Sequence, residues 1–154
     1  GQGFNYQYIG TNARFDTIQA AVLLAKLPHF DDEILRRQHL AARYSEALGD
    51  VCEVPSVASG NTHVFTPYTV RLDHRDRVCS LLRERGIPVA IYYPRCLHQQ
   101  PAYAAYEDSK SCPEGELASR EVMSLPLYPF LTESEQDRVI SGLRDVIAEV
   151  SNNR

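Results

Sequence analysis

The side chains that could ligate a metal ion or act as thiol nucleophiles follow no recognisable spacing in this chain. Its five histidines show no HxxxH or HExxH pattern, and its four cysteines form no CxxC pair. No zinc-type ligand set results, so no metal site is expected. Widely spaced cysteines in a chain with a plausible core are typical of reduced thiols, which predicts a cytoplasmic protein. The histidines are His29, His39, His63, His74 and His98, and the cysteines are Cys52, Cys79, Cys96 and Cys112.

Two polar side chains near the N-terminus have chemistry suited to binding anions. Asn12 and Arg14 lie in a predicted loop, rich in glycine, asparagine and tyrosine, just before the first predicted helix. An amide can donate a hydrogen bond to phosphate, and a guanidinium can bind a carboxylate through two parallel hydrogen bonds. From the residues alone, a turn residue and a surface charge are the simpler interpretation.

A second group of candidates lies in the middle of the chain. Tyr92 and Tyr93 end a predicted strand over residues 87–93, so their side chains should point to opposite faces, one buried and one facing a cleft. Packing of both rings in the core is the alternative. His98 and Arg95 follow in a loop, where a single charged or imidazole side chain is ordinarily solvated.

The elements that must position these residues begin with two helices. Asp16 and Gln19 form a capping-box pattern at the start of a helix that Pro28 ends. This helix is apolar nearly all round, which predicts burial in the core or against another subunit. A second helix is predicted over 32–48, with Gly49 as a left-handed cap after its C-terminus.

The rest of the chain mixes strands and helices. We expect an α+β unit with a short sheet and flanking helices. Because two strands alone are marginal in water, we also expect either a third short strand near 124–127 or a partner domain. The predicted elements are a strand over 63–72, a helix over 73–86 ended by Gly86, a strand over 87–93, a helix over 113–123, and an amphipathic helix over 132–150 with a Thr132–Glu135 capping box.

Length, charge and composition exclude several classes of protein. The 154 residues fit one domain, and the net charge is −4 with basic residues interspersed among acids. Without a basic patch, nucleic-acid binding is not expected. No apolar run is long enough for a membrane span, and no signal peptide is visible at Gly1.

Four stretches, taken together, resemble the C-terminal part of the DegT/StrS-type sugar aminotransferases. Their order and spacing carry the resemblance, which covers essentially the whole chain. It implies an aspartate-aminotransferase-like fold, known as fold type I, with pyridoxal 5'-phosphate as cofactor and a homodimeric enzyme. The stretches are GTNARFDTIQAAVLLAKL (10–27), HVFTPYTVRLDHRDRVCSLLRERGI (63–87), YYPRCLHQQPAY (92–103) and MSLPLYPFLTESEQ (123–136).

Within that family the pattern is similar to enzymes that aminate a 3-keto UDP-N-acetylglucosaminuronic acid, with glutamate as amino donor, for bacterial surface polysaccharides. The resemblance implies that Asn12 binds the phosphate of the cofactor and Arg14 the sugar, both across the dimer interface. It also implies substrate-facing positions for Tyr92, Tyr93 and His98. Such relatives often carry histidine at the position of Tyr92.

The resemblance further implies a lysine that binds the cofactor as a Schiff base. The only lysines are Lys26 and Lys110, and neither lies in the family's lysine motif. We therefore expect this chain to hold no catalytic residue and to be inactive by itself, because the large N-terminal domain with that lysine would lie outside it. Relatives also carry a basic residue where Tyr8 stands, which puts a charge contact from that position in doubt.

These expectations divide the chain into two parts. Residues 1–30 would form a substrate and cofactor loop with an interface helix, and residues 31–154 the C-terminal small domain. The alternative hypothesis is a stand-alone α+β module that binds a ligand or mediates dimerisation without catalysis.

Overall fold

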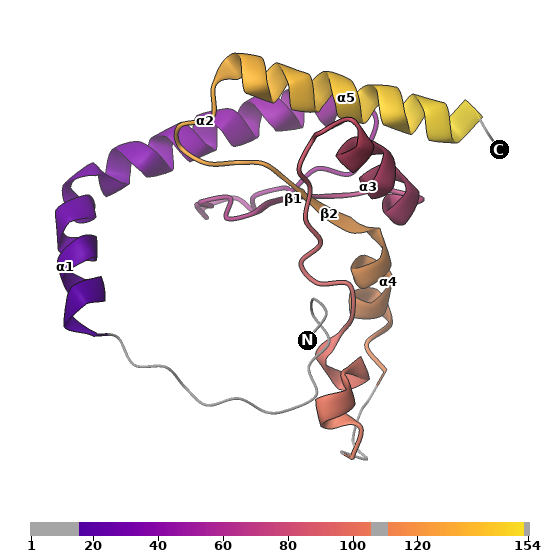
Figure 1. Ribbon diagram of the computed structural model, residues 1–154, viewed down its shortest axis with the longest axis horizontal. Helices are drawn as coiled ribbons and strands as arrows, with labels where there is room; N and C mark the ends of the chain where they lie inside the picture. Colours follow the sequence, from indigo (N-terminus) through magenta and orange to yellow (C-terminus); the bar gives the residue numbers. More distant parts are fainter. Residues whose placement is uncertain (1–15, 106–110, 153–154) are drawn as a thin grey trace.

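The fold is built from five helices and two strands within the residues that the structure describes. The structure is a computed structural model that describes residues 16–105 and 111–152. Short 3-10 turns join several of the elements (Figure 1). In chain order they are α1 (Thr17–Lys26), η1 (Leu27–His29), α2 (Phe30–Leu48), β1 (Tyr68–Arg71), α3 (Arg75–Glu84), η2 (Leu97–Gln99), η3 (Pro101–Tyr103), α4 (Pro113–Glu121), β2 (Val122–Leu125) and α5 (Glu133–Asn152).

The two strands form a minimal antiparallel sheet. Tyr68 pairs with Leu125, and Val70 pairs with Met123. These four side chains are buried, so one face of each strand belongs to the core. On the alternate positions, the hydroxyls of Thr69 and Ser124 lie 2.9 Å apart and form a hydrogen bond.

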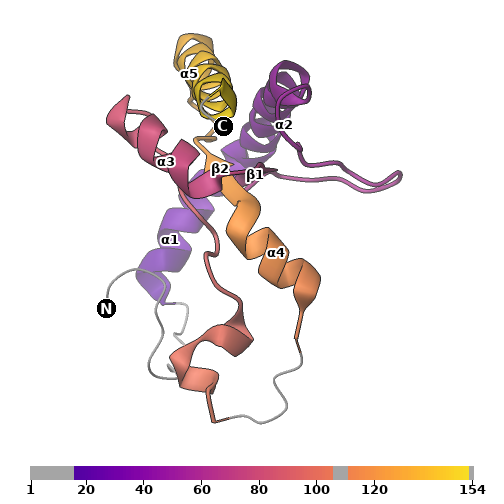
Figure 2. The same ribbon diagram turned by 90° about the vertical axis from the view of Figure 1, so that its right-hand side faces the viewer.

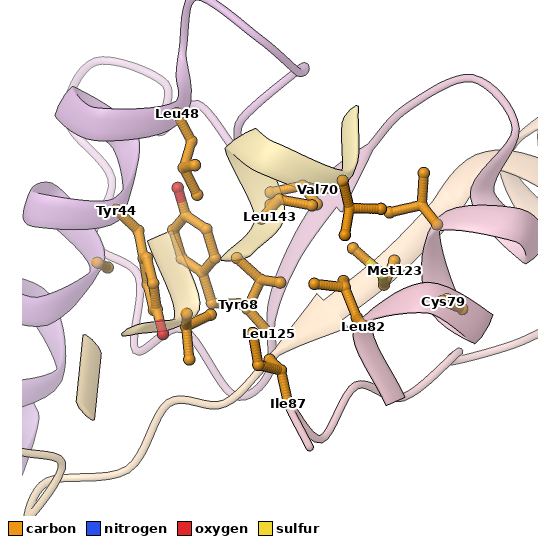
Figure 3. Close-up of a cluster of buried hydrophobic side chains, with 14 of the residues drawn as sticks. Tyr44, Leu48, Tyr68, Val70, Cys79, Leu82, Ile87, Met123, Leu125 and Leu143 are labelled. Atoms are coloured by element: carbon orange, nitrogen blue, oxygen red, sulfur yellow. The ribbon is translucent and has the colours of Figure 1, made fainter. Parts of the chain in front are cut away.

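Three helices cover the apolar side of this sheet. The long helices α2 and α5 run side by side, and α3 packs against α5 (Figures 1 and 2). Figure 3 shows Tyr44 of α2, Leu82 of α3 and Leu143 of α5 meeting the strand residues in one cluster. The ring of Tyr44 lies 5.1 Å from that of Tyr68. The predicted α+β class, with a short antiparallel sheet and flanking helices, is confirmed.

The predicted strand over 87–93 is wrong. The segment makes one isolated bridge, in which Ala90 and Ser124 exchange two backbone hydrogen bonds of 3.1 and 2.7 Å. Pro88 has no N–H to donate to a ladder, which limits pairing to that single position. The strand predicted near 124–127 does form, two residues earlier, as β2.

The strand predicted over 63–72 is shorter than expected and begins only at Tyr68. Pro67 lacks the N–H that a longer ladder requires, and Phe65 has a φ of 48°, outside the strand region. The Phe65 N–H donates instead to Nδ1 of His63 at 2.8 Å. The helix predicted over 113–123 ends at Glu121, because Val122 and Met123, which the prediction placed in the helix, belong to β2.

The predicted helix caps are largely confirmed. The Asp16–Gln19 capping box is present at α1, and the Thr132–Glu135 pair caps α5 with backbone-to-side-chain bonds of 2.8 and 3.2 Å. Gly86 ends α3 with a φ of 69°. Gly49 is the exception, because it keeps a right-handed conformation with a φ of −64°.

Helix α1 does not meet the expectation of burial within this chain. It lies apart from the sheet (Figure 1), and none of its residues is buried. Leu24, for example, is 70% exposed. Its packing against another subunit, the other half of the expectation, stays a prediction. No helix among the described residues is long and apolar enough to cross a bilayer.

The core and α1 should respond differently to the same truncation. We expect Leu143→Ala to lower the free energy of unfolding by about 2–5 kcal/mol, because it opens a cavity in the core between α5 and the sheet. Leu24→Ala should change it by less than about 0.5 kcal/mol. Urea denaturation of the 154-residue chain measures both. Equal losses would contradict the exposed position of α1.

The cysteines should also differ in reactivity. Burial raises the pKa of Cys52 to about 11 and raises that of Cys79 as well, whereas Cys112 is exposed. At pH 8 a thiol with a pKa of about 11 is ionised in roughly one molecule in a thousand. Timed alkylation followed by peptide mass spectrometry should modify Cys112 first. Alkylation of Cys52 at the same rate would contradict this burial.

Candidate functional site

A pocket of about 520 Å³ lies between α4 and the segment we call the pocket loop, residues 92–100. Figure 2 shows this loop descending beside α4, below the sheet. The lining is mostly apolar with a few polar groups, as in sites for small molecules. The lining residues are Tyr92, Tyr93, Arg95, Cys96, Leu97, Gln100, Gly115, Ala118, Ser119 and Val122.

Tyr92 and Tyr93 both line this pocket. Their rings lie 5.9 Å apart at 70°, edge to face, and the residues are 46% and 56% exposed. The expectation that one ring would be buried is wrong, because the segment is not a strand and does not alternate its faces. Two partly exposed rings at a pocket offer a surface on which a planar or sugar ring can pack.

His98 is brought to a different place. It does not line the pocket, although its neighbours Leu97 and Gln100 do. Its Nε2 lies 3.0 Å from Oε1 of Glu116 on α4. This hydrogen bond, together with one from the Cys112 N–H, holds the pKa of the Glu116 carboxyl below its usual range.

The position of α4 depends on Arg75, whose side chain is only 4% exposed. Its guanidinium donates to the carbonyl of Val122 at 2.6 Å and to that of Ser119 at 3.0 Å. Both acceptors belong to the pocket wall and to the junction of α4 with β2. In addition, an ion pair joins the guanidinium of Arg71 to Oε2 of Glu121 at 2.6 Å. Two cations thus fix the end of α4 against the sheet.

Sequence reasoning missed three residues around the pocket: Arg75, Gln100 and Glu116. One signal was available for Arg75, because it stands in the first turn of a helix, where the macrodipole disfavours a positive charge. Such a residue needs acceptors from elsewhere. Asn12 and Arg14 lie outside the described residues, and so does Lys110.

The described part of the pocket does not fit pyridoxal phosphate by itself. Neither a lysine nor an acidic side chain is among its described lining residues, so an amine for the Schiff base and a partner for the pyridine nitrogen are both missing. Lys26, the one lysine in the described ranges, is exposed on α1. No group of three metal-ligating side chains was found in those ranges either.

Comparison with known proteins gives a consistent result. The sequence pattern of the DegT/DnrJ/EryC1/StrS aminotransferase family matches residues 1–144. A UDP-2-acetamido-2-deoxy-3-oxo-D-glucuronate aminotransferase of Pseudomonas aeruginosa is 42% identical over 134 residues, covering 85% of this chain and 37% of that protein. A dTDP-3-amino-3,4,6-trideoxy-alpha-D-glucose transaminase of Streptomyces venezuelae is 37% identical over 147 residues, covering 94% and 39%.

The fold comparison agrees with the sequence comparison. A DegT DnrJ EryC1 StrS aminotransferase from Brucella abortus superposes with a TM-score of 0.81 at 40% identity, covering 94% of this chain and 39% of that one. The chain therefore spans about two fifths of the length of the relatives that it matches.

The role of Arg75 can be tested by removing its donors while keeping its bulk. Arg75→Met should lower the free energy of unfolding by about 2–4 kcal/mol, because two carbonyls lose their partner in a buried place. Arg77→Met, on the same helix but exposed, should change it by less than about 0.5 kcal/mol. Urea denaturation of each variant measures this. Similar values for the two variants would mean that Arg75 does not hold α4.

Proposed function

This chain belongs to the DegT/DnrJ/EryC1/StrS aminotransferase family, and we propose that it is the C-terminal part of an enzyme that moves an amino group from glutamate to a keto nucleotide sugar. The observation that carries the proposal is the pocket beneath the sheet, walled by Tyr92, Tyr93 and Arg95. Its volume of about 520 Å³ suits a small-molecule site. A cation and two aromatic rings at one pocket match the chemistry of a charged sugar derivative.

The cofactor chemistry would come from elsewhere in the protein. Members of this family depend on pyridoxal phosphate, which accepts electrons from the bond next to the transferred nitrogen. The described pocket has neither the lysine nor the acidic partner for it. We propose that both are supplied by polypeptide beyond these 154 residues, and that the chain alone is inactive and binds the cofactor weakly.

The residues of this chain would bind and orient the sugar. Tyr92 and Tyr93 would pack against it and exclude water, while Asn12 and Arg14 would reach into the active site of a second copy. There Asn12 would donate to the cofactor phosphate. Arg14 would bind the carboxylate of the sugar with two parallel hydrogen bonds, a geometry that lysine cannot reproduce.

The class of sugar can be inferred by matching the charge of the substrate to the cations of the site. A uronic acid derivative, the substrate class named for the Pseudomonas aeruginosa relative, carries a carboxylate that requires a cation in the site. A dTDP-linked trideoxy sugar, the class named for the Streptomyces venezuelae relative, has no carboxylate on its ring and carries charge only on the diphosphate and on any amino group. In this proposal Arg14 and Arg95 would supply the cation for that carboxylate, so the preferred sugar would be a UDP-linked uronate. A product of that kind would serve bacterial surface-polysaccharide synthesis.

One observation favours a second candidate function. The exposed apolar side chains of α1 would also suit a non-catalytic dimerisation module, because large exposed apolar patches commonly mark interfaces. The two proposals differ in their cofactor. An enzyme has a cofactor-binding lysine in its full-length form, whereas a module dimerises without one.

The experiment compares the full-length protein with this chain. We expect the full-length protein to purify yellow with cofactor and to aminate a 3-keto UDP-uronate from glutamate, and the 154-residue chain to be colourless and inactive. Arg14→Met should lower kcat/KM for the uronate by about tenfold or more, because a charged hydrogen-bond pair is lost. Steady-state kinetics with that sugar and with a neutral keto sugar measure the preference.

Arg120→Met is the matched control, since Arg120 is exposed on α4 and does not line the pocket. It should leave kcat/KM unchanged. A full-length protein that binds no cofactor, or a yellow chain whose colour borohydride fixes to Lys26 or Lys110, would overturn the proposal.

A further inference from the structure

We propose that His98 is a positioning residue, which holds the pocket loop against α4 through Glu116 and so sets the width of the pocket without touching the substrate. The inference rests on the proposed function for what the pocket binds. It rests on the described contacts alone for what His98 does. It replaces the substrate-facing role that family resemblance implied for this histidine.

The local helix geometry directs His98 away from the pocket. Residues Leu97–Gln99 form the 3-10 turn η2, in which side chains three positions apart share a face. Leu97 and Gln100 are three apart and both line the pocket. His98 is displaced by about a third of a turn from them. Its ring therefore lies on a different face of the turn from the two side chains that line the pocket, and it reaches Glu116 on α4.

Glu116 on α4 accepts several hydrogen bonds besides that of His98. Oε1 of Glu116 accepts hydrogen bonds from Nε2 of His98, the Cys112 N–H and the Ser111 hydroxyl, at donor–acceptor distances of 3.0, 3.3 and 3.4 Å. The His98 and Glu116 side chains are only 21% and 23% exposed. A carboxylate can only accept, so Nε2 of His98 must carry the proton in this pair.

The pair joins the two walls of the pocket. Glu116 stands on α4 between Gly115 and Ala118, which line one wall, and His98 stands in the pocket loop, which forms the other. The walls also approach closely near Gly115, where a Cβ would lie 3.5 Å from Sγ of Cys96. Loss of the hydrogen bond would free the loop at the end opposite Tyr92 and widen the pocket.

Two roles for His98 make opposite predictions in the full-length enzyme. If His98 acts through Glu116, His98→Ala and Glu116→Ala should each raise KM for the keto sugar by roughly three- to tenfold, with kcat changed less. The double variant should be no worse than either single one, because both remove the same contact. If His98 contacts the sugar, Glu116→Ala should leave KM unchanged.

Hydrogen exchange gives a readout that does not need activity. The amides of Gln99 and Gln100 donate to Cys96 and Leu97 within the turn η2, at 3.1 and 3.0 Å. Their exchange should be roughly three- to tenfold faster in His98→Ala, because the turn opens more often once its tether is gone. Glu116→Ala should have the same effect, since it removes the acceptor of that tether.

Conservative and control variants complete the test. His98→Gln and Glu116→Gln keep a donor and an acceptor and should restore part of the protection of the turn. Glu114→Ala, an exposed change on the same helix turn, should leave exchange and KM as they are. Unchanged exchange in His98→Ala would overturn the proposal. A protein without sugar aminotransferase activity would instead refute the proposed function, while the exchange data still decide the role of His98.

Discussion

A two-stranded sheet is too small to be stable in water, so the structure depends on the helices that cover its one apolar face. Tyr68, Val70, Met123 and Leu125 form that face, and α2, α3 and α5 bury it. The strands come from segments more than fifty residues apart, so their pairing and the helix packing must form together. Once they do, the ends of β1 and β2 are fixed, and so are the starting points of the segments that join them, including α3 and α4.

The pocket is attached to this framework by polar contacts. Arg75 of α3 binds the carbonyls of Ser119 and Val122, and Arg71 of β1 pairs with the carboxylate of Glu121. These contacts fix the C-terminal end of α4 relative to the sheet and α3. The Ala90–Ser124 bridge holds the chain against the sheet just before the pocket loop, and His98 joins the loop to α4. Apolar burial thus determines the fold, and a few charged or polar contacts determine the geometry of the site.

Most features that depend on neighbouring residues were predictable from the sequence, with the Gly49 cap as an exception, and features that depend on distant partners were not. The capping pairs Asp16–Gln19 and Thr132–Glu135 act over three residues, so their patterns sufficed. The segment 87–93 alternates like a strand, but pairing also requires a free edge and available N–H groups. The acceptors of Arg75 lie 44 and 47 residues away, which no local pattern reveals. The class of chemistry came from the order of four stretches, each of which is weak alone.

The placement of the pocket below the sheet has a consequence for how such proteins diverge. Its walls come from one stretch of some thirty consecutive residues, 92–122, and almost none of them belongs to the hydrophobic core. Substitutions there leave the packing beneath the helices untouched, and loops accept sequence change more readily than the elements they connect. Selection could therefore alter which ligand the pocket accepts, while the residues of the core stay under a separate constraint of packing.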